Sequence, residues 1–314
     1  MNYFDLHCDT AYEMYTRHES LRRNTLAVDL DGFDVYEHKA QVFAIWSENT
    51  RPADTVYHDF FEILENLKKQ VAENDDRAVL CTDRACLTDG DTRLKVIPAV
   101  EGARILENDL TRLEALRERG VRILTLAWEG ESPVCGAYDT DTGLTEFGYR
   151  VVEHCEELGI LVDVSHLSEK GFWEVANVAK KPFLATHSNA RALCDHPRNL
   201  SDTQIRTVVS QHGLIGASLV GRHLSKALQE GLAKEDTFVG KEALSRHLVH
   251  MIERAGAKNL CFGCDWDGTD PLAGLERVGQ LASFGTYMTD HGAPQELVDD
   301  LFYGNAYRFF AENL

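Results

Sequence analysis

Residues 161–187 read Leu-Val-Asp-Val-Ser-His-Leu-Ser-Glu-Lys-Gly-Phe-Trp-Glu-Val-Ala-Asn-Val-Ala-Lys-Lys-Pro-Phe-Leu-Ala-Thr-His. Two short apolar runs, 161–164 and 182–186, flank an amphipathic segment, 168–179, that opens on a serine. Runs of this kind are typical of buried strands, and a serine before an amphipathic segment is a helix-capping signal. This stretch therefore predicts a strand, a helix and a second strand, with His166 two residues after the first run and His187 directly after the second.

The same unit recurs along the chain. Apolar runs comparable to these two are residues 3–7, 41–46, 95–100, 123–126, 214–219 and 260–263, which makes eight candidate strands. The amphipathic segments between runs include 57–73, 110–119, 145–158, 202–211 and 241–255. Strand and helix alternating eight times favour a closed (β/α)8 TIM barrel.

The length of 314 residues fits one such barrel, and no Pro-, Ser- or Gly-rich linker divides the chain. We therefore expect a single domain, residues 1–314, with the C-terminal helices 294–302 and 305–313 packed outside the barrel and a less clear segment at 272–287 before them. An open doubly wound sheet is the alternative architecture. It has no motif in its favour, because neither GxGxxG nor GxxxxGK[ST] follows any candidate strand.

The charge of the chain bears on its partners and its location. Thirty-two basic and fifty-one acidic side chains give a formal net charge of −19, which disfavours nucleic-acid and anionic membrane partners. The N-terminus lacks the basic and apolar regions of a signal peptide, and no apolar run approaches the roughly 20 residues that span a bilayer. We expect a cytoplasmic protein.

Eight cysteines are scattered along the chain. In a long chain without an export signal they are expected to be reduced thiols rather than disulfides. Two cysteine pairs resemble one half of a zinc-ribbon site: Cys261-Phe-Gly-Cys264 and Cys81-Thr-Asp-Arg-Ala-Cys86. Neither has a second cysteine pair at the spacing that such a site needs. We therefore interpret both pairs as structural.

Potential metal ligands follow four of the candidate strands. They are His7 and Asp9 after the first, Glu101 after the third, and His166 and His187 after the fifth and sixth. A barrel gathers its strand ends at one mouth, and side chains two apart along a strand, such as His7 and Asp9, face the same side. Any one of these residues alone fits a capped turn or a satisfied core position, but packing alone does not account for all five. Histidine and carboxylate ligands together suit zinc.

Two further strand ends carry candidate catalytic and binding groups. Asp265 and Asp267 lie two apart after the eighth strand, so one of them could act as general acid and base if the chain stays extended; a solvated turn is the competing account. Beyond His187, Arg191 and Arg198 place guanidinium groups near the same rim. Such a group suits a substrate carboxylate through a bidentate contact, and surface solvation explains Arg191 better than Arg198.

These motifs together resemble the membrane dipeptidase, or renal dipeptidase, family of zinc metallopeptidases within the amidohydrolase group. The matching pieces run in order from residue 5 to residue 268: Asp5-Leu-His7-Cys-Asp9, Val100-Glu101-Gly102, Asp163-Val-Ser-His166, Thr186-His187-Ser188, Asp195-His-Pro-Arg198-Asn199-Leu-Ser-Asp202 and Gly263-Cys-Asp265-Trp-Asp267-Gly268. The resemblance therefore covers nearly the whole chain.

The resemblance implies a binuclear zinc dipeptidase that cleaves short unblocked dipeptides by a hydroxide between the metals. One zinc would be bound by His7, Asp9 and Glu101, and the second by Glu101, His166 and His187, with Glu101 bridging; manganese, iron and cobalt remain open as alternatives. The family's proton shuttle falls on Asp267, with Asp265 as second choice, and its carboxylate-binding arginine falls on Arg198. Relatives in the family are often homodimers.

The chain departs from the mammalian pattern after the fourth strand. Trp128 stands where those enzymes carry a substrate-contacting histidine, and its single N–H cannot fully replace an imidazole. This puts the rate and the substrate preference in question. The metal ligands alone would also serve a lactonase or deacylase, and a non-catalytic barrel that binds metal or peptide is the alternative from another class.

Overall fold

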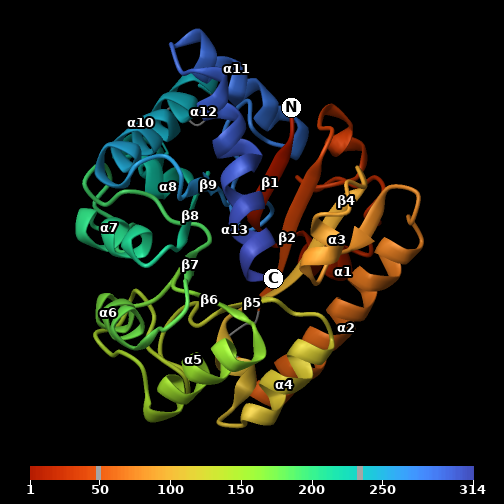
Figure 1. Ribbon diagram of the computed structural model, residues 1–314, viewed down its shortest axis with the longest axis vertical. Coiled ribbons are helices and arrows are strands. Elements are labelled where there is room, and N and C mark those ends of the chain that lie inside the picture. The colour runs from red at the N-terminus through yellow and green to blue at the C-terminus, as the bar shows by residue number, and fades with distance from the viewer. Residues whose placement is uncertain (47–50, 232–235) are drawn as a thin grey trace.

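Eight parallel strands close into a barrel in the computed structural model, which describes residues 1–46, 51–231 and 236–314 (Figure 1). The barrel strands are β1 (Tyr3–Cys8), β2 (Lys39–Trp46), β4 (Leu94–Glu101), β5 (Ile123–Thr125), β6 (Leu161–Asp163), β7 (Leu184–Ala185), β8 (Leu214–Ala217) and β9 (Leu260–Phe262). Their order around the ring is β2-β1-β9-β8-β7-β6-β5-β4, and parallel pairing of β2 with β4 closes it. The predicted (β/α)8 barrel is confirmed, and the open sheet is excluded because the ring has no free edge.

Each of the eight predicted runs overlaps one barrel strand. A further short strand, β3 (Ala78–Leu80), pairs with the beginning of β4 outside the ring and was not predicted. Three residues are too few to show the alternation on which a strand prediction depends. The segment is nevertheless fixed, because Cys81 continues the ladder by donating from its backbone N to Val96 O at 2.8 Å.

Helices connect the strands and surround them. They are α1 (Thr10–Arg17), α2 (Ala53–Ala72), α3 (Arg84–Leu87), α4 (Leu110–Glu118), α5 (Glu146–Leu158), α6 (Glu169–Val178), α7 (Asp202–Ser210), α8 (Gly221–Leu224), α9 (Lys226–Gln229), α10 (Thr237–Ala255), α11 (Ala282–Asp290), α12 (Gln295–Asp299) and α13 (Asn305–Asn313). Shorter turns of helix are η1 (Asp31–Val35), η2 (Ala103–Leu106), η3 (Val278–Leu281) and η4 (Asp300–Gly304). Within the described ranges, no helix combines the length and the apolar character needed to cross a membrane.

The predicted caps explain where several helices begin and end. Ser168 accepts a hydrogen bond from Gly171 N at the start of α6, and Ser201 forms a reciprocal capping box with Gln204 at the start of α7. The helix α10 begins at Thr237, earlier than the predicted Lys241, because the Asp236 carboxylate accepts hydrogen bonds from the first turn.

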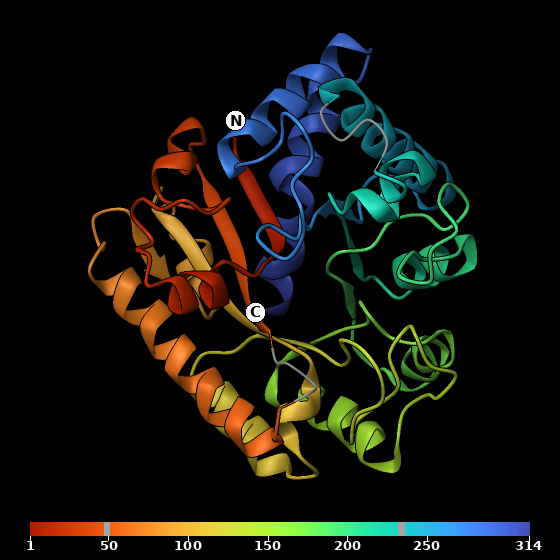
Figure 2. The ribbon, with the colours of Figure 1, turned by 180° about the vertical axis from the view of Figure 1, so that it is seen from behind.

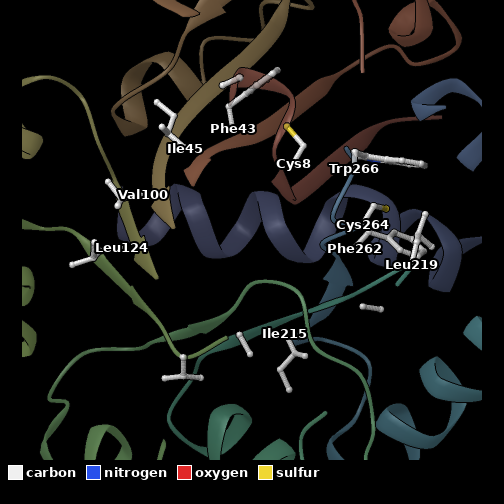
Figure 3. Packing of buried hydrophobic residues seen from close by; sticks show 14 of the residues in the cluster. Cys8, Phe43, Ile45, Val100, Leu124, Ile215, Leu219, Phe262, Cys264 and Trp266 are labelled. Atoms are coloured by element: carbon white, nitrogen blue, oxygen red, sulfur yellow. The ribbon is translucent and has the colours of Figure 1, made fainter. Parts of the chain in front are cut away.

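Two apolar clusters lie on the two sides of the strands. Figure 3 shows part of the larger cluster, in which Phe43, Ile45, Val100 and Leu124 come from adjacent strands. The smaller cluster fills the inside of the barrel near the amino-terminal ends of the strands. It consists of alternate residues of the strands, such as Phe4, and of residues of α13. The helix α13 crosses the centre of the ring in Figure 1, and its Phe310 ring lies 4.8 Å from that of Phe4. This helix therefore covers the amino-terminal end of the barrel, and the loops at the opposite end face the viewer in Figure 2.

One irregularity in β1 decides which side chains face inward. Asp5 pairs with Gln41 and Cys8 pairs with Phe43, so three steps along β1 match two along β2. The extra residue is a β-bulge, which re-aims the side chains that follow it. After the bulge, Cys8 packs in the larger cluster with Phe43, between the strands and the helices, and His7 faces the barrel mouth.

Candidate metal centre and active site

His7 is held at the end of β1 by the buried carboxylate of Asp5. That carboxylate accepts hydrogen bonds from His7 N at 2.9 Å, from Cys264 N at 2.9 Å and from the Gln41 side chain at 3.0 Å. The contacts join three neighbouring parts of the barrel: β1, β2 and the segment that follows β9. Asp5 therefore fixes the backbone of His7 without itself reaching the mouth.

Glu101 places its two oxygens against different histidines. Its Oε2 lies 3.7 Å from His7 Nε2, whereas its Oε1 lies 2.9 Å from His166 Nε2 and 3.4 Å from His187 Nε2. Asp9 Oδ2 completes the first side at 3.7 Å from His7 Nε2. The carboxylate of Glu101 thus stands between two sets of potential ligands.

The orientation of each histidine ring on the second side is set by a hydrogen bond at Nδ1. His166 Nδ1 donates to the backbone oxygen of Trp128 at 2.8 Å. The Thr186 hydroxyl donates its hydrogen bond to Asp163 Oδ2 at 2.6 Å. It can therefore only accept from the His187 ring, so His187 Nδ1 donates to Thr186 Oγ1 at 2.8 Å. Both rings therefore carry their proton on Nδ1 and point an Nε2 lone pair into the mouth.

The convergence of these lone pairs fits a cation. The Nε2 atoms of His166 and His187 lie 2.9 Å apart, although neither carries a proton to share. On the other side, His7 Nε2 and Asp9 Oδ1 are buried and find no hydrogen-bond partner among the described residues. Buried lone pairs that face one another without a donor are costly, and a divalent metal satisfies them. The donor set therefore suits the metal that the sequence predicts.

The pKa values describe the charge that such a metal would meet. Burial lowers the pKa of His166 and that of His187, which keeps both imidazoles neutral. Burial also acts to lower the pKa of His7, but Glu101, Asp9 and Asp265 outweigh it and raise that pKa to about 10. Without metal, His7 therefore holds a proton in the position where a ligand lone pair is needed.

The two acids of the Asp-Trp-Asp-Gly motif lie in different surroundings. Asp265 Oδ1 lies 4.0 Å from His7 Nε2, and Asp265 forms with His7 and Asp9 a group close enough to share one ion. Asp267 instead accepts hydrogen bonds from Thr10 Oγ1 at 2.6 Å and from Ala27 N at 2.7 Å. The backbone is not extended here, because Asp265 and Asp267 have φ values of 64° and 66°. Only the first acid faces the metal ligands.

Gly268 leaves room for these carboxylates. A Cβ atom added to this glycine would lie 2.1 Å from Asp9 Oδ2 and 2.3 Å from Asp265 Oδ1. Both distances are far shorter than any non-bonded contact allows. The absence of a side chain at this position is therefore a requirement of the site, which the sequence analysis did not identify.

Arg198 lies beside the cluster, and its side chain is only 5% exposed. Its guanidinium stands 5.8 Å from the centre of the Tyr138 ring, on which it packs as a cation on an aromatic face. No ion pair of Arg198 occurs within the described part of the chain, whereas Arg191 pairs with Glu169 at 3.2 Å. Arg198 is thus the arginine with free capacity for an incoming carboxylate.

Trp128 contributes its backbone to the centre and its ring to the wall. Its carbonyl orients His166, as described above, and its ring meets that of Trp46 edge-on at 4.7 Å between centres. Trp46 in turn packs against Tyr12 at 5.1 Å. The position that departs from the mammalian pattern is therefore part of an aromatic wall at the ends of β2 and β5.

The sequence analysis did not single out Asp163 and Tyr138. Asp163 is fully buried and accepts hydrogen bonds from the hydroxyls of Thr125 and Thr186, so it governs the orientation of His187. A signal for it existed, because an aspartate inside an apolar run that ends in a histidine needs buried donors. Tyr138 lies in a long connection between β5 and α5, where no periodic pattern marks it.

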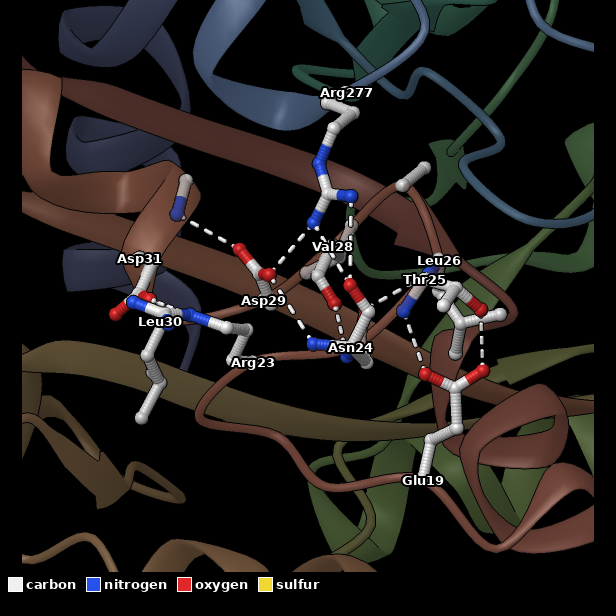
Figure 4. A network of polar contacts seen from close by, with 12 residues as sticks. Glu19, Arg23, Asn24, Thr25, Leu26, Val28, Asp29, Leu30, Asp31 and Arg277 are labelled. Atoms are coloured by element: carbon white, nitrogen blue, oxygen red, sulfur yellow. Dashed lines mark hydrogen bonds and ion pairs between the residues drawn. The ribbon is translucent and has the colours of Figure 1, made fainter.

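A cavity of about 470 Å³ adjoins the cluster at Asp265. One wall is the turn after β9, and the other is the loop 18–30, which contributes Leu26 and Ala27. Figure 4 shows how this loop is held: the buried Asp29 carboxylate pairs with Arg277 at 2.6 Å and accepts a hydrogen bond from Asn24 N at 3.3 Å. The cavity is large enough for a small molecule, and both Asp265 and Asp267 line it.

Comparison with known proteins decides the family of the chain. The family model described as "Membrane dipeptidase (Peptidase family M19)" matches residues 1–313. The chain belongs to the membrane dipeptidase family. As a member, it is a metal-dependent dipeptidase, a hydrolase, and the resemblance inferred from the motifs is confirmed.

The chain is also similar to two curated proteins, one of which is named a dipeptidase. An uncharacterized protein in the pqqA 5′ region of Klebsiella pneumoniae is 30% identical over 251 residues, which cover 76% of this chain and 90% of the relative. An uncharacterized dipeptidase of Schizosaccharomyces pombe is 26% identical over 72% of this chain, and the match spans 55% of that longer protein.

Solved structures of other members have the same fold. A metallo peptidase from Rhodobacter sphaeroides, liganded with a phosphinate mimic of the dipeptide L-Ala-D-Ala, superposes with a TM-score of 0.91 at 25% identity and covers 100% of this chain and 99% of its own. The dipeptidase AC, also a metallo peptidase, superposes with a TM-score of 0.88 at 28% identity. This match covers 100% of this chain and 98% of the dipeptidase AC chain.

Proposed function

We propose that the chain is a binuclear zinc dipeptidase in which Glu101 bridges the two metals. His7 and Asp9 would complete one site, and His166 and His187 the other. The single observation that carries the proposal is the set of buried nitrogen and oxygen ligand atoms that converge on Glu101 from both sides, with the Nε2 lone pairs of His166 and His187 facing each other at 2.9 Å. When bound, the metals supply Lewis-acid polarisation of the peptide carbonyl and lower the pKa of water.

Arg198 binds the free carboxylate of the dipeptide. Its burial, the Tyr138 ring beneath it and its lack of an ion pair in the described residues support this role. A buried guanidinium binds a carboxylate strongly because little water competes for it. A substrate without that carboxylate leaves the guanidinium unpaired, so the site selects unblocked C-termini.

Asp265 holds the proton that the leaving amine requires. The sequence motif alone assigned this role first to Asp267, but the contacts of Asp267 with Thr10 and Ala27 support Asp265 instead. Both acids line the cavity, but Asp265 is the one beside His7, at 4.0 Å from Asp265 Oδ1 to His7 Nε2. A carboxylate in this position can accept a proton on one side and donate it to the nitrogen of the broken bond.

Trp128 orients rather than reacts. Its carbonyl keeps the His166 proton on Nδ1, and its ring with that of Trp46 gives the dipeptide an apolar wall. The oxyanion contact that a histidine gives in the mammalian enzymes is then left to other donors. We expect a different substrate preference from those enzymes, not loss of activity.

A substrate panel tests the proposal. The zinc-loaded protein is incubated with L,L-dipeptides, with L,D-dipeptides such as L-Ala-D-Ala, and with N-acyl amino acids and lactones. The inhibitor mimic bound to the Rhodobacter relative supports including a D-residue at the second position. Release of free amino acids from dipeptides is expected. Turnover confined to the acyl amino acids or lactones would favour the lactonase or deacylase alternative.

A further inference from the structure

Two cysteines lie together at the end of the barrel opposite the candidate metal centre. Cys81 follows β3, and Cys86 lies in α3. The sulfur of Cys86 is 3.7 Å from Leu80 O, the carbonyl that leads directly into Cys81, and the sulfur of Cys81 is 3.8 Å from Asp83 O. The connection between them is short and folded back, so the Cys86 sulfur lies over the carbonyl that precedes Cys81, and the Cys81 sulfur faces Asp83 at the start of α3.

The fold holds this arrangement in place. Asp83 caps α3 by accepting a hydrogen bond from Cys86 N at 2.9 Å, while Cys81 N is fixed to Val96 O on β4. A contact between the two thiols contributes to the pKa of Cys81, which burial raises first and the hydrogen bond with Cys86 raises further. The two side chains therefore meet without rearrangement of the backbone ladder.

Cys86 is also the accessible member of the pair. It is partly exposed, whereas the other seven cysteines are buried. Lys95 Nζ lies 4.0 Å from its sulfur and also lines a cavity of about 310 Å³ on this face of the barrel. The partial exposure of Cys86 lets a small reagent reach its sulfur, which has beside it the Lys95 ammonium, itself paired with Asp89 at 2.7 Å, and the Cys81 thiol behind it.

We propose that Cys81 and Cys86 form a redox-active dithiol that closes to an intramolecular disulfide on exposure to hydrogen peroxide. The Cys86 sulfur attacks the peroxide, the O–O bond breaks, and Cys86 becomes a sulfenic acid as one water is released. The Cys81 sulfur then attacks the Cys86 sulfur, forms the S–S bond and expels a second water. Two thiols are oxidised by two electrons and one hydrogen peroxide is reduced.

Trypsin provides a direct readout, because Arg84 lies between the two cysteines. The reduced, alkylated protein gives separate peptides 78–84 and 85–93. After treatment with about one equivalent of hydrogen peroxide, mass spectrometry under non-reducing conditions is expected to find these two peptides joined, two mass units lighter than the sum of the two peptides with free thiols. Dithiothreitol should separate them again.

Three variants distinguish this pair from general thiol oxidation. Cys86→Ser should abolish the joined peptides, and Cys81→Ser should leave a Cys86 sulfenic acid that dimedone traps. Cys155→Ser, which changes a buried thiol in α5, should leave the joined peptides unchanged. Oxidation of Cys86 to the sulfinic acid without joined peptides, linkage to another cysteine, or no reaction at a peroxide excess that oxidises the urea-unfolded chain would each overturn the proposal.

Discussion

Asp267 Oδ2 lies 2.6 Å from Thr10 Oγ1, so the turn after β9 is joined to the first residue of α1. The other oxygen of the same carboxylate accepts the Ala27 backbone hydrogen bond and so reaches the loop that walls the cavity. Burial raises the pKa of Asp267, and these two hydrogen bonds oppose that effect. Asp267 therefore stabilises the framework of the mouth, while Asp265 faces its interior.

Replacing the two acids separates these roles. Asp265→Asn should keep both metals and lower kcat by about 10²- to 10⁴-fold, the usual contribution of a general acid or base. Asp267→Ala should lower the thermal midpoint of the zinc-loaded protein, because two buried donors lose their acceptor at a cost of about 1–3 kcal/mol each. Metal analysis, steady-state kinetics and thermal unfolding of both variants check this. The opposite pattern would return the proton shuttle to Asp267.

Substitution of Arg198 should act on substrate binding. Arg198→Met removes the bidentate partner of the substrate carboxylate and should raise KM for a dipeptide by at least about tenfold, in line with about 1.5–3 kcal/mol for a charged hydrogen bond. For a dipeptide amide, which lacks the carboxylate, the KM of the same variant should be nearly that of the unaltered protein. Arg191→Met is the matched control, since Arg191 is already paired with Glu169. Equal losses with dipeptide and amide would argue against carboxylate binding.

Gly268→Ala should disturb the metal centre through a single methyl group. The new Cβ would collide with Asp9 Oδ2 and Asp265 Oδ1, so either carboxylate must move. We expect metal content after dialysis to fall and turnover with it. Gly221→Ala is the control, because a Cβ there meets only ordinary contacts of 3.4 Å or more. Full metal content and turnover in Gly268→Ala would show that the close approach is not required.

Loading the metal-free protein with zinc should release protons. The pKa of His7 is about 10 without metal, so this ring is protonated at pH 7 and must lose its proton to become a ligand. Zinc affinity should therefore rise with pH between 6 and 9, because the concentration of the protons that compete with zinc for the His7 nitrogen falls as pH increases. Calorimetry in two buffers of different ionisation enthalpy measures the number released. Equal heats in both buffers would contradict the protonated state of His7.

The alternation of strand and helix could be predicted from the sequence, because each barrel strand is an apolar run that ends at a turn or a helix cap. The directions of the side chains at the mouth were harder to predict. His7 was expected to share a face with Asp9 by simple alternation, but its direction depends on the bulge that follows Asp5, which no local residue preference announces. Asp265 and Asp267 could not be separated from the sequence, because left-handed backbone at both replaces the extended chain that alternation assumes.

The bulge in β1 has a consequence for anyone who redesigns or transplants this strand. If β1 paired with β2 residue for residue, without the bulge, His7 would lie opposite Phe43 and Cys8 opposite Ala44. From His7 onward the side chains would then change faces, so that Cys8 would point into the mouth and the imidazole of His7 would lie among the helices. In this barrel, a small defect in hydrogen-bond pairing is what keeps the first histidine available for chemistry.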